Sequence, residues 1–307
     1  MLSIIWNVTN SCPWNCTFCA TGAGMNRQRT ELTYQDKLLA IENLNGVDCR
    51  VDLSGGEVML NREEHMPLIA ALSAAIGKDR LGISCSGAYI KENEAAFLSK
   101  HVEDVEMTMD AHPERDFPHR PKGYHSTAGE AADRLIAKGV RVGLQTVVTR
   151  NHCDNPVLLD ELHDWLCNHK ISEWSLIRYF PAGRGVDFPK LGLMNEENLS
   201  LVSRAKNLCS KPNSPKLDIH YLMPGTDKDT HCRCVRKSIG ILPNGDVTSC
   251  FWGLDVNGNI SNSRFLLGNI VKTPLVRILR GTNARYWQNY CGDCPLDQGG
   301  NQHVFIA

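Results

Sequence analysis

Over about its first 180 residues the chain alternates short β-rich runs with helical segments, and this alternation constrains the fold most strongly. Strands are expected where branched and aromatic residues gather, at residues 4–8, 50–53, 81–85, 105–109, 140–148 and 174–179. The segments between them carry helix signals, such as Thr33 with Asp36 as a capping box and Gly46 as a stop. Repeated βα units form a parallel sheet, whose ligand site lies at the carboxyl ends of the strands.

After residue 185 the composition changes. A linking helix is expected at residues 195–208 and an extended run at 217–221. From residue 226 onward the chain is rich in Gly, Asn, Asp and Cys and has few long apolar runs. Small segments of this kind often depend on a metal or a cross-link for order.

Charge and hydropathy exclude some classes of partner. The net charge is −1, which gives no reason to expect a nucleic acid or an anionic membrane surface. No apolar stretch reaches the roughly eighteen residues of a membrane span, and the N-terminus has no export signal. We therefore expect a cytoplasmic protein. In that reducing compartment, clustered cysteines are more often metal ligands than disulfides.

Eight of the thirteen cysteines fall into two groups, Cys12–Cys19 and Cys232–Cys294. The first group, Cys12-x3-Cys16-x2-Cys19, lies in a loop after the first expected strand. Three thiolates cannot close a structural zinc site, which requires four ligands. They can hold a 4Fe–4S cluster with one iron open to a cofactor. The alternative is a zinc loop whose fourth ligand lies elsewhere.

With Phe18 before its last cysteine, this loop closely resembles that of the radical S-adenosylmethionine (SAM) superfamily, and the resemblance covers the whole chain. It implies that the amino and carboxylate groups of SAM chelate the open iron. One electron then breaks a carbon–sulfur bond of SAM and yields a 5′-deoxyadenosyl radical. The resemblance also implies an electron donor such as flavodoxin or ferredoxin.

Further motifs follow the other strands. Gly55-Gly56-Glu57 resembles the GGE motif of the superfamily, whose backbone receives the SAM ammonium group, and Ser86 stands where asparagine is usual. Similar matches surround Thr108–Asp110, Arg120–Tyr124 and Arg178–Gly185. The implied cofactor-binding residues are Gly55, Gly56, Glu57, Ser86, Asp110, Arg120 and Arg178. Arg184 is also expected to touch SAM or a carboxylate, whereas Asp110 could instead be a solvated strand-end carboxylate.

The cysteines of the second group lie before and after a predicted β-hairpin, residues 241–247 with a turn at Asn244-Gly245. Its order resembles that of the auxiliary-cluster domains called SPASM and, in the short form, twitch. That resemblance implies one auxiliary 4Fe–4S cluster, with a zinc site as the alternative on spacing alone. The implied ligands are Cys232, Cys250, Cys291 and Cys294.

The fold class implied is α/β: a partial (βα)6 TIM-like barrel with a small C-terminal twitch-type auxiliary cluster domain. We expect the barrel at 1–190, a linker helix and strand at 191–225, and the auxiliary domain at 226–307.

Cys232 and Cys234 compete for one ligand role. In relatives the first ligand precedes the proline of the turn by eleven residues, and Cys232 to Pro243 meets that count. Cys234 is then a spare thiol that could donate a hydrogen atom to a substrate radical, which makes it the candidate catalytic residue. The alternative is a packed or exposed bystander.

The resemblance implies hydrogen-atom abstraction from an unactivated carbon, and the fate of the radical sets the enzyme type. Loss of an electron gives a carbonyl or a cross-link, and return of a hydrogen atom gives an epimer. Short twitch proteins resemble aminocyclitol dehydrogenases and aminoglycoside or nucleoside epimerases, so we expect a small-molecule substrate, a polar natural-product intermediate. A peptide-modifying maturase is the first alternative, and a non-catalytic zinc or redox scaffold is the second.

Overall fold

The computed structural model describes residues 1–307 except 26–29, 221, 224–230 and 297–307, and its described strands form one sheet in the order β10-β9-β8-β1-β2-β3-β4-β5-β6-β7. Seven of them run parallel in chain order: β1 (Leu2–Asn7), β2 (Cys49–Ser54), β3 (Leu81–Cys85), β4 (Asp104–Thr108), β5 (Arg141–Val148), β6 (Glu173–Arg178) and β7 (Lys216–Ile219). The α/β class and the parallel sheet are therefore confirmed.

The last of these strands differs from expectation. The run placed in a linker forms β7 and pairs in parallel with β6, with Leu176 opposite Ile219. The sheet thus has a seventh βα-type strand, and α7 (Asn195–Cys209) is its crossover helix. Sequence reasoning treated this run as a linker because a long irregular segment, residues 179–194, separates it from β6.

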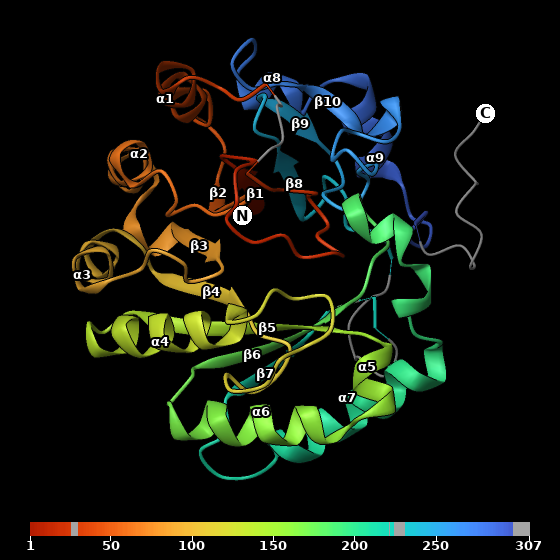
Figure 1. Cartoon of the computed structure of the whole chain (residues 1–307). Helices are drawn as coiled ribbons and strands as arrows, with labels where there is room; N and C mark the ends of the chain where they lie inside the picture. Colours follow the sequence, from red (N-terminus) through yellow and green to blue (C-terminus); the bar gives the residue numbers. More distant parts are fainter. Residues whose placement is uncertain (26–29, 221, 224–230, 297–307) are drawn as a thin grey trace.

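The C-terminal segment extends the other edge of the same sheet. β8 (Ser238–Ile241) pairs in parallel with β1, and β9 (Asp246–Thr248) and β10 (Leu266–Asn269) follow antiparallel. The expected hairpin is confirmed: Gly245 has a φ of 84°, and its N–H donates to Leu242 O at 2.8 Å. Figure 1 shows this segment beside β1, so the C-terminal cysteines lie near the strand that leads into the first cysteine loop.

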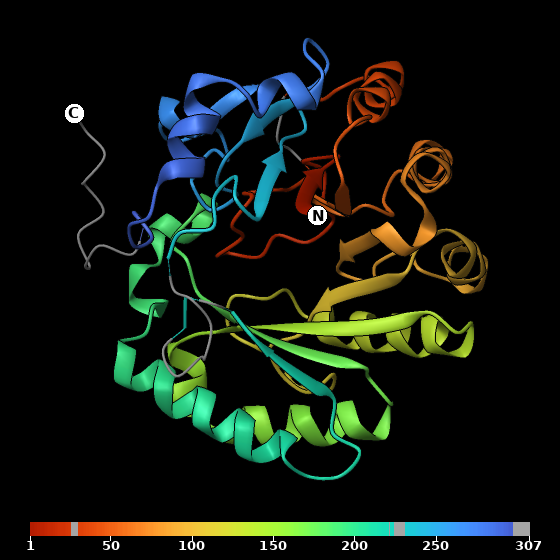
Figure 2. The ribbon, with the colours of Figure 1, turned by 180° about the vertical axis from the view of Figure 1, so that it is seen from behind.

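Helices cover the outer face of the curved sheet (Figures 1 and 2). The long ones, besides α7, are α1 (Tyr34–Asn43), α2 (Arg62–Ile76), α3 (Glu92–His101), α4 (Tyr124–Ala137) and α6 (Val157–Asn168). Shorter helices are α5 (Arg150–Asp154), α8 (Leu275–Ile278) and α9 (Thr282–Asn289). The capping box of α1 is present: Asp36 N–H donates to Thr33 Oγ1, and Thr33 N–H donates to Asp36 Oδ2.

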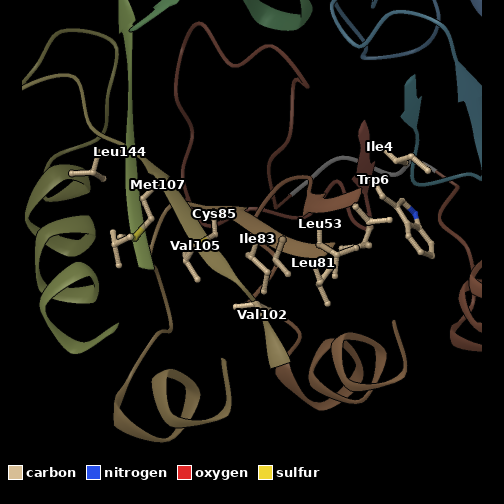
Figure 3. Packing of buried hydrophobic residues seen from close by; sticks show 14 of the residues in the cluster. Ile4, Trp6, Leu53, Leu81, Ile83, Cys85, Val102, Val105, Met107 and Leu144 are labelled. Atoms are coloured by element: carbon tan, nitrogen blue, oxygen red, sulfur yellow. The ribbon is translucent and has the colours of Figure 1, made fainter. Parts of the chain in front are cut away.

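The apolar core lies between these helices and the sheet. Leu53, Ile83 and Val105 point toward the helices and are at most 1% exposed (Figure 3). Because side chains alternate along a strand, their neighbours Asp52 and Glu106 face the inside of the curve. The inner face is therefore polar, as a binding site requires.

The described part of the chain contains no helix with both the length and the apolar character needed to cross a bilayer.

Candidate active site

The cysteine loop, residues 8–25, leaves the carboxyl end of β1 and is held by the turn that follows β2. Gly56 N–H donates to Thr9 O and Glu57 N–H donates to Ser11 O, both at 2.8 Å. A Cβ on Gly56 would lie 2.1 Å from Ser11 O, so the two backbones meet only because residue 56 is glycine. From the sequence, these glycines were expected to contact a ligand. In the structure they also allow the GGE turn to pack on the cysteine loop.

Glu57 links this turn to the end of β3. Its buried carboxylate accepts hydrogen bonds from Met59 N–H at 3.1 Å and from both the N–H and the hydroxyl of Ser86. The Ser86 hydroxyl in turn accepts from Trp14 Nε1 at 2.8 Å, so the chain of bonds ends on the cysteine loop. Burial raises the pKa of Glu57, and the bonds from Ser86 oppose that rise.

Sequence reasoning missed Trp14, although its place between Cys12 and Cys16 was a usable signal. Its indole also packs edge-on against Tyr124, with ring centroids 5.3 Å apart. Trp14 therefore anchors the middle of the cysteine loop on two other elements.

Arg184 holds the loop from the opposite side. Its Nε and Nη2 donate to Cys16 O at 2.9 and 2.7 Å, and its Nη1 donates to Ala23 O at 2.7 Å. The guanidinium is bonded to carbonyls of the loop and also lines the cavity beside it, so the expected contact with SAM or a carboxylate stays a prediction. Gly183 fits beside it with a φ of 54°, because a Cβ there would lie 2.3 Å from Ala20 O.

Asp110 follows β4 and is completely buried, so the interpretation as a solvated carboxylate is wrong. Its Oδ2 accepts from Arg120 Nε at 2.6 Å and its Oδ1 accepts from Val147 N–H at 2.9 Å. Burial alone would raise the pKa of Asp110, but the charge of the adjacent Arg120 guanidinium holds it well below its usual range.

The three thiols of the loop differ in acidity. Burial raises the pKa of Cys12 to about 12 and also raises that of Cys16, against the opposing charge of Arg120. Burial disfavours the Cys19 thiolate too, but a hydrogen bond from Thr21 and the charge of Arg184 lower its pKa overall.

Among the residues that the structure describes, no three Cys, His, Asp or Glu side chains converge closely enough to hold a metal ion. The donor set nevertheless fits an iron–sulfur cluster, because three soft thiolates lie on one firmly held loop that lines a cavity. Metal binding would deprotonate the thiols and draw them together.

The C-terminal thiols lie around the β8–β9 hairpin. Cys232, Cys234 and Cys250 are neighbours, and the Cys234 thiol lowers the pKa of both Cys232 and Cys250. Cys232 N–H donates to Gly292 O at 3.1 Å, which brings in the segment that carries the last two cysteines. Cys294 is buried, whereas Cys291 is exposed. The thiols present fit a thiolate-ligated auxiliary cluster, and Cys234 lies between two of its expected ligands.

One cavity of about 450 Å³, here called the chamber, joins the two thiol groups. Its wall includes Cys12, Cys16 and Cys19 from the cysteine loop and Cys234 and Cys250 from the C-terminal segment. The strands contribute the polar residues Asp52, Ser84, Glu106, Thr108 and Gln145.

Other parts of the wall are aromatic and cationic. Phe180 stacks on Trp252 with ring centroids 5.0 Å apart, and the Arg178 guanidinium lies 5.8 Å from the Phe180 ring. Gly55, Gly56, Ser86 and Arg120 also line the chamber. The expected cofactor residues therefore meet there, except for Glu57 and Asp110, which are buried behind the wall.

Two family models match the chain. The model of the radical SAM superfamily matches residues 6–162, and that of the SPASM iron–sulfur cluster-binding domain matches residues 232–295. The chain belongs to the radical SAM superfamily and is a radical SAM enzyme with a SPASM domain. This membership implies a 4Fe–4S cluster and SAM, and the SPASM domain implies auxiliary iron–sulfur binding.

Solved structures share the fold at low identity. Native anSMEcpe with bound AdoMet is 16% identical, with a TM-score of 0.68 over 94% of this chain and 82% of that one. Streptococcus suis SuiB bound to the precursor peptide SuiA is also 16% identical, with a TM-score of 0.72 over 94% and 67%.

A curated relative matches part of the chain. Fe-coproporphyrin III synthase of Methanosarcina barkeri is 27% identical over 203 residues, which are 65% of this chain and 49% of the relative. The chain thus spans about half the length of this relative.

Proposed function

We propose that this enzyme cleaves SAM reductively and abstracts a hydrogen atom from a small polar natural-product intermediate, such as a sugar, an aminoglycoside or a nucleoside. The product is an epimer or an oxidised carbinol. The observation that carries the proposal is the chamber, whose wall holds the thiols of the cysteine loop and also Cys234 and Cys250. When bound, the cluster and SAM supply the 5′-deoxyadenosyl radical; positioning and hydrogen return fall to the residues of this chain.

The chamber wall supports a site for SAM. The GGE turn at Gly55 and Gly56 offers backbone carbonyls to the SAM ammonium group, and Ser86 fixes that turn through Glu57. Arg178 lies in the same wall and offers a guanidinium to the SAM carboxylate, a pairing that suits its planar fork.

The size of the chamber and the polar residues on its strand side favour a small polar substrate. Its volume of about 450 Å³ is typical of small-molecule sites, and SAM fills a large share of it. Only a compact part of a substrate fits beside SAM, against the polar residues Glu106, Thr108 and Gln145. Hydroxyl or amine groups would find hydrogen-bond partners there.

Cys234 is the proposed hydrogen-atom donor for epimerisation. Its S–H bond breaks, the new C–H bond forms on the substrate radical, and a thiyl radical remains. One electron and one proton from an external donor, such as reduced flavodoxin or ferredoxin, restore the thiol. Carbinol oxidation would instead pass one further electron from the substrate radical to the auxiliary cluster, release one proton to solvent, and need no thiol donor.

The test is anaerobic turnover with a panel of aminoglycosides and nucleosides in D2O. We expect one class to stimulate formation of 5′-deoxyadenosine and, for an epimerase, to gain one solvent deuterium at one carbon. Cys234→Ala should still form 5′-deoxyadenosine but stop short of the epimer, whereas Cys153→Ala, on helix α5, should be unaffected.

Two results would contradict the proposal. Stimulation only by a peptide would identify a peptide-modifying maturase. An unchanged yield of epimer from Cys234→Ala would remove this thiol from the reaction.

A further inference from the structure

The strand side of the chamber carries a carboxylate that has only neutral partners among the described residues. Glu106 lies on β4 between Val105 and Met107, which point toward the helices, so its side chain faces the inside of the curved sheet (Figure 3). Glu106 lines the chamber, and its Oε1 accepts a hydrogen bond from the Ser175 hydroxyl at 3.3 Å. Within the part of the chain that the structure describes, no Lys, Arg or His forms an ion pair with this carboxylate.

The arginines of strands β2 and β5 already have other partners. Arg50 Nη2 donates to Asp52 Oδ1 at 2.8 Å and to Asp104 Oδ1 at 2.7 Å. Arg141 also pairs with Asp104. A guanidinium could neutralise Glu106 only by giving up an aspartate, so the charge of Glu106 stays available to a ligand.

The residues beside Glu106 are small. In the register of the sheet, Glu106 lies opposite Ser84 of β3 and Gly143 of β5. Even a Cβ on Gly143 would lie 3.8 Å from Glu106 Cγ, in ordinary contact. Ser84 lines the chamber together with Glu106. A small ligand group in the chamber can therefore lie next to the carboxylate.

The cations of the chamber wall lie elsewhere. Arg120, Arg178 and Arg184 lie at or beyond the carboxyl ends of β4 and β6, where the GGE turn offers a site for SAM. Glu106 precedes Thr108, the end of β4, by two residues, which places it about 7 Å deeper at roughly 3.3 Å per residue. A substrate group that reaches past SAM into the barrel therefore meets a carboxylate.

We propose that Glu106 determines the specificity of the substrate site by binding a protonated amino group, so that the substrate is an amine-bearing intermediate and not a neutral one. The inference rests on the proposed small-molecule function and narrows its substrate class. An ammonium group brings both charge and hydrogen-bond donors to a buried carboxylate that has no cation of its own, whereas a hydroxyl group brings only a donor. Burial raises the pKa of Glu106 to about 7, and a bound ammonium group would lower it again.

The test compares amines with their uncharged N-acetyl forms. The probes are glucosamine, neamine and 3′-amino-3′-deoxyadenosine, each with its N-acetylated form. Calorimetry with the SAM-loaded holoenzyme, without a reductant, measures binding, and kcat/KM for 5′-deoxyadenosine formation measures turnover. Because acetylation also adds bulk, the change of the preference in a Glu106 variant reports the charge.

We expect the wild type to prefer the amine of at least one pair by about tenfold or more, and Glu106→Gln to lose most of that preference. Glu106→Asp keeps the charge and should retain part of the preference. Asp52→Asn should change it less than Glu106→Gln, because Arg50 already neutralises Asp52. Glu130→Gln, at an exposed position of α4, should leave it unchanged. Iron content and SAM cleavage without substrate report that each variant is folded and loaded.

Two results would overturn the inference. The first is that no pair shows tighter binding of the amine form to the wild type. The second is an unchanged preference in a fully loaded Glu106→Gln. Turnover of neutral sugars or nucleosides as fast as of their amines would overturn this inference alone, whereas stimulation only by a peptide would overturn the proposed function as well.

Discussion

The two thiol groups of this enzyme differ in what holds them. The cysteine loop is bonded to the GGE turn, to Arg184 and to the segment that carries Arg120, all of them parts of the barrel. Among the C-terminal thiols, Cys232, Cys234 and Cys250 are neighbours, whereas Cys294 packs against Phe180 and Leu222 and Cys291 faces solvent. The backbone of the cysteine loop is thus held by the barrel, and we expect the auxiliary site to depend more on its cluster for its final arrangement.

The largest effect should come from releasing the cysteine loop. Arg184→Ala removes three hydrogen bonds to two loop carbonyls, Cys16 O and Ala23 O, and leaves Cys16 O with only the bond from Cys19 N–H at 3.3 Å. We expect formation of 5′-deoxyadenosine to fall by about a hundredfold or more, with loss of iron from this loop only. Chromatography of 5′-deoxyadenosine and iron analysis measure both.

Arg204→Ala is the matched control for that change, since Arg204 pairs with Asp160 on the outer helices. If Arg184→Ala kept its iron and its activity, the loop would not need this support, and the contrast between the two thiol groups would fail.

An intermediate effect should come from the close contact between the backbone of the GGE turn and that of the cysteine loop. In Gly56→Ala the new methyl group would overlap Ser11 O, so the GGE turn or the cysteine loop must move. We expect the free energy of unfolding to fall by about 1–3 kcal/mol, measured by anaerobic urea denaturation. Gly143→Ala is the control, because its Cβ would have ordinary contacts at 3.8 Å and beyond. Equal stability of the two variants would show that the close approach is not needed.

The smallest effect concerns Glu106 in the chamber wall, whose pKa burial raises to about 7 from an ordinary value of 4.5. Between those values the folded state binds more protons than the unfolded state, so the free energy of unfolding falls as the pH rises. Glu106→Gln removes this pH-dependent contribution to the free energy of unfolding. Its stability relative to wild type should therefore increase from about pH 5 to about pH 8, measured by urea denaturation at each pH.

Glu130→Gln, at an exposed position of α4, controls for the loss of one carboxylate. A difference between Glu106→Gln and wild type that stays constant with pH would contradict the raised pKa.

Much of the scaffold could be predicted because the spacing of apolar residues along the sequence shows which faces of strands and helices are buried. The expected strand at residues 81–85 agrees with β3 residue for residue, and the order of βα units placed the cysteine loop and the GGE turn at one edge of the sheet. The extended run at 217–221 was predicted, but its place in the sheet as β7 was not, because a long irregular segment follows β6.

The contacts within the site were harder to predict, because a motif tells which residues gather and not which atoms they bond. Arg184 was expected at a cofactor, and its three hydrogen bonds to the cysteine loop were not foreseen. Ser86 departs from the usual asparagine, yet it bonds Glu57 with both its N–H and its hydroxyl. The contact of Cys234 with Cys232 and Cys250 depends on how the β8–β9 hairpin folds back, which spacing alone cannot reveal.

The central claim is that one thiol group generates the radical and the other acts after it. The most direct measurement compares Cys12→Ala/Cys16→Ala/Cys19→Ala with Cys250→Ala/Cys294→Ala after anaerobic reconstitution, by iron content and by 5′-deoxyadenosine formed from SAM under a strong reductant. Each variant should lose about four of about eight irons, and only the first should lose formation of 5′-deoxyadenosine. Formation of 5′-deoxyadenosine by the first variant, or its absence from a second variant that keeps its remaining iron, would contradict the account.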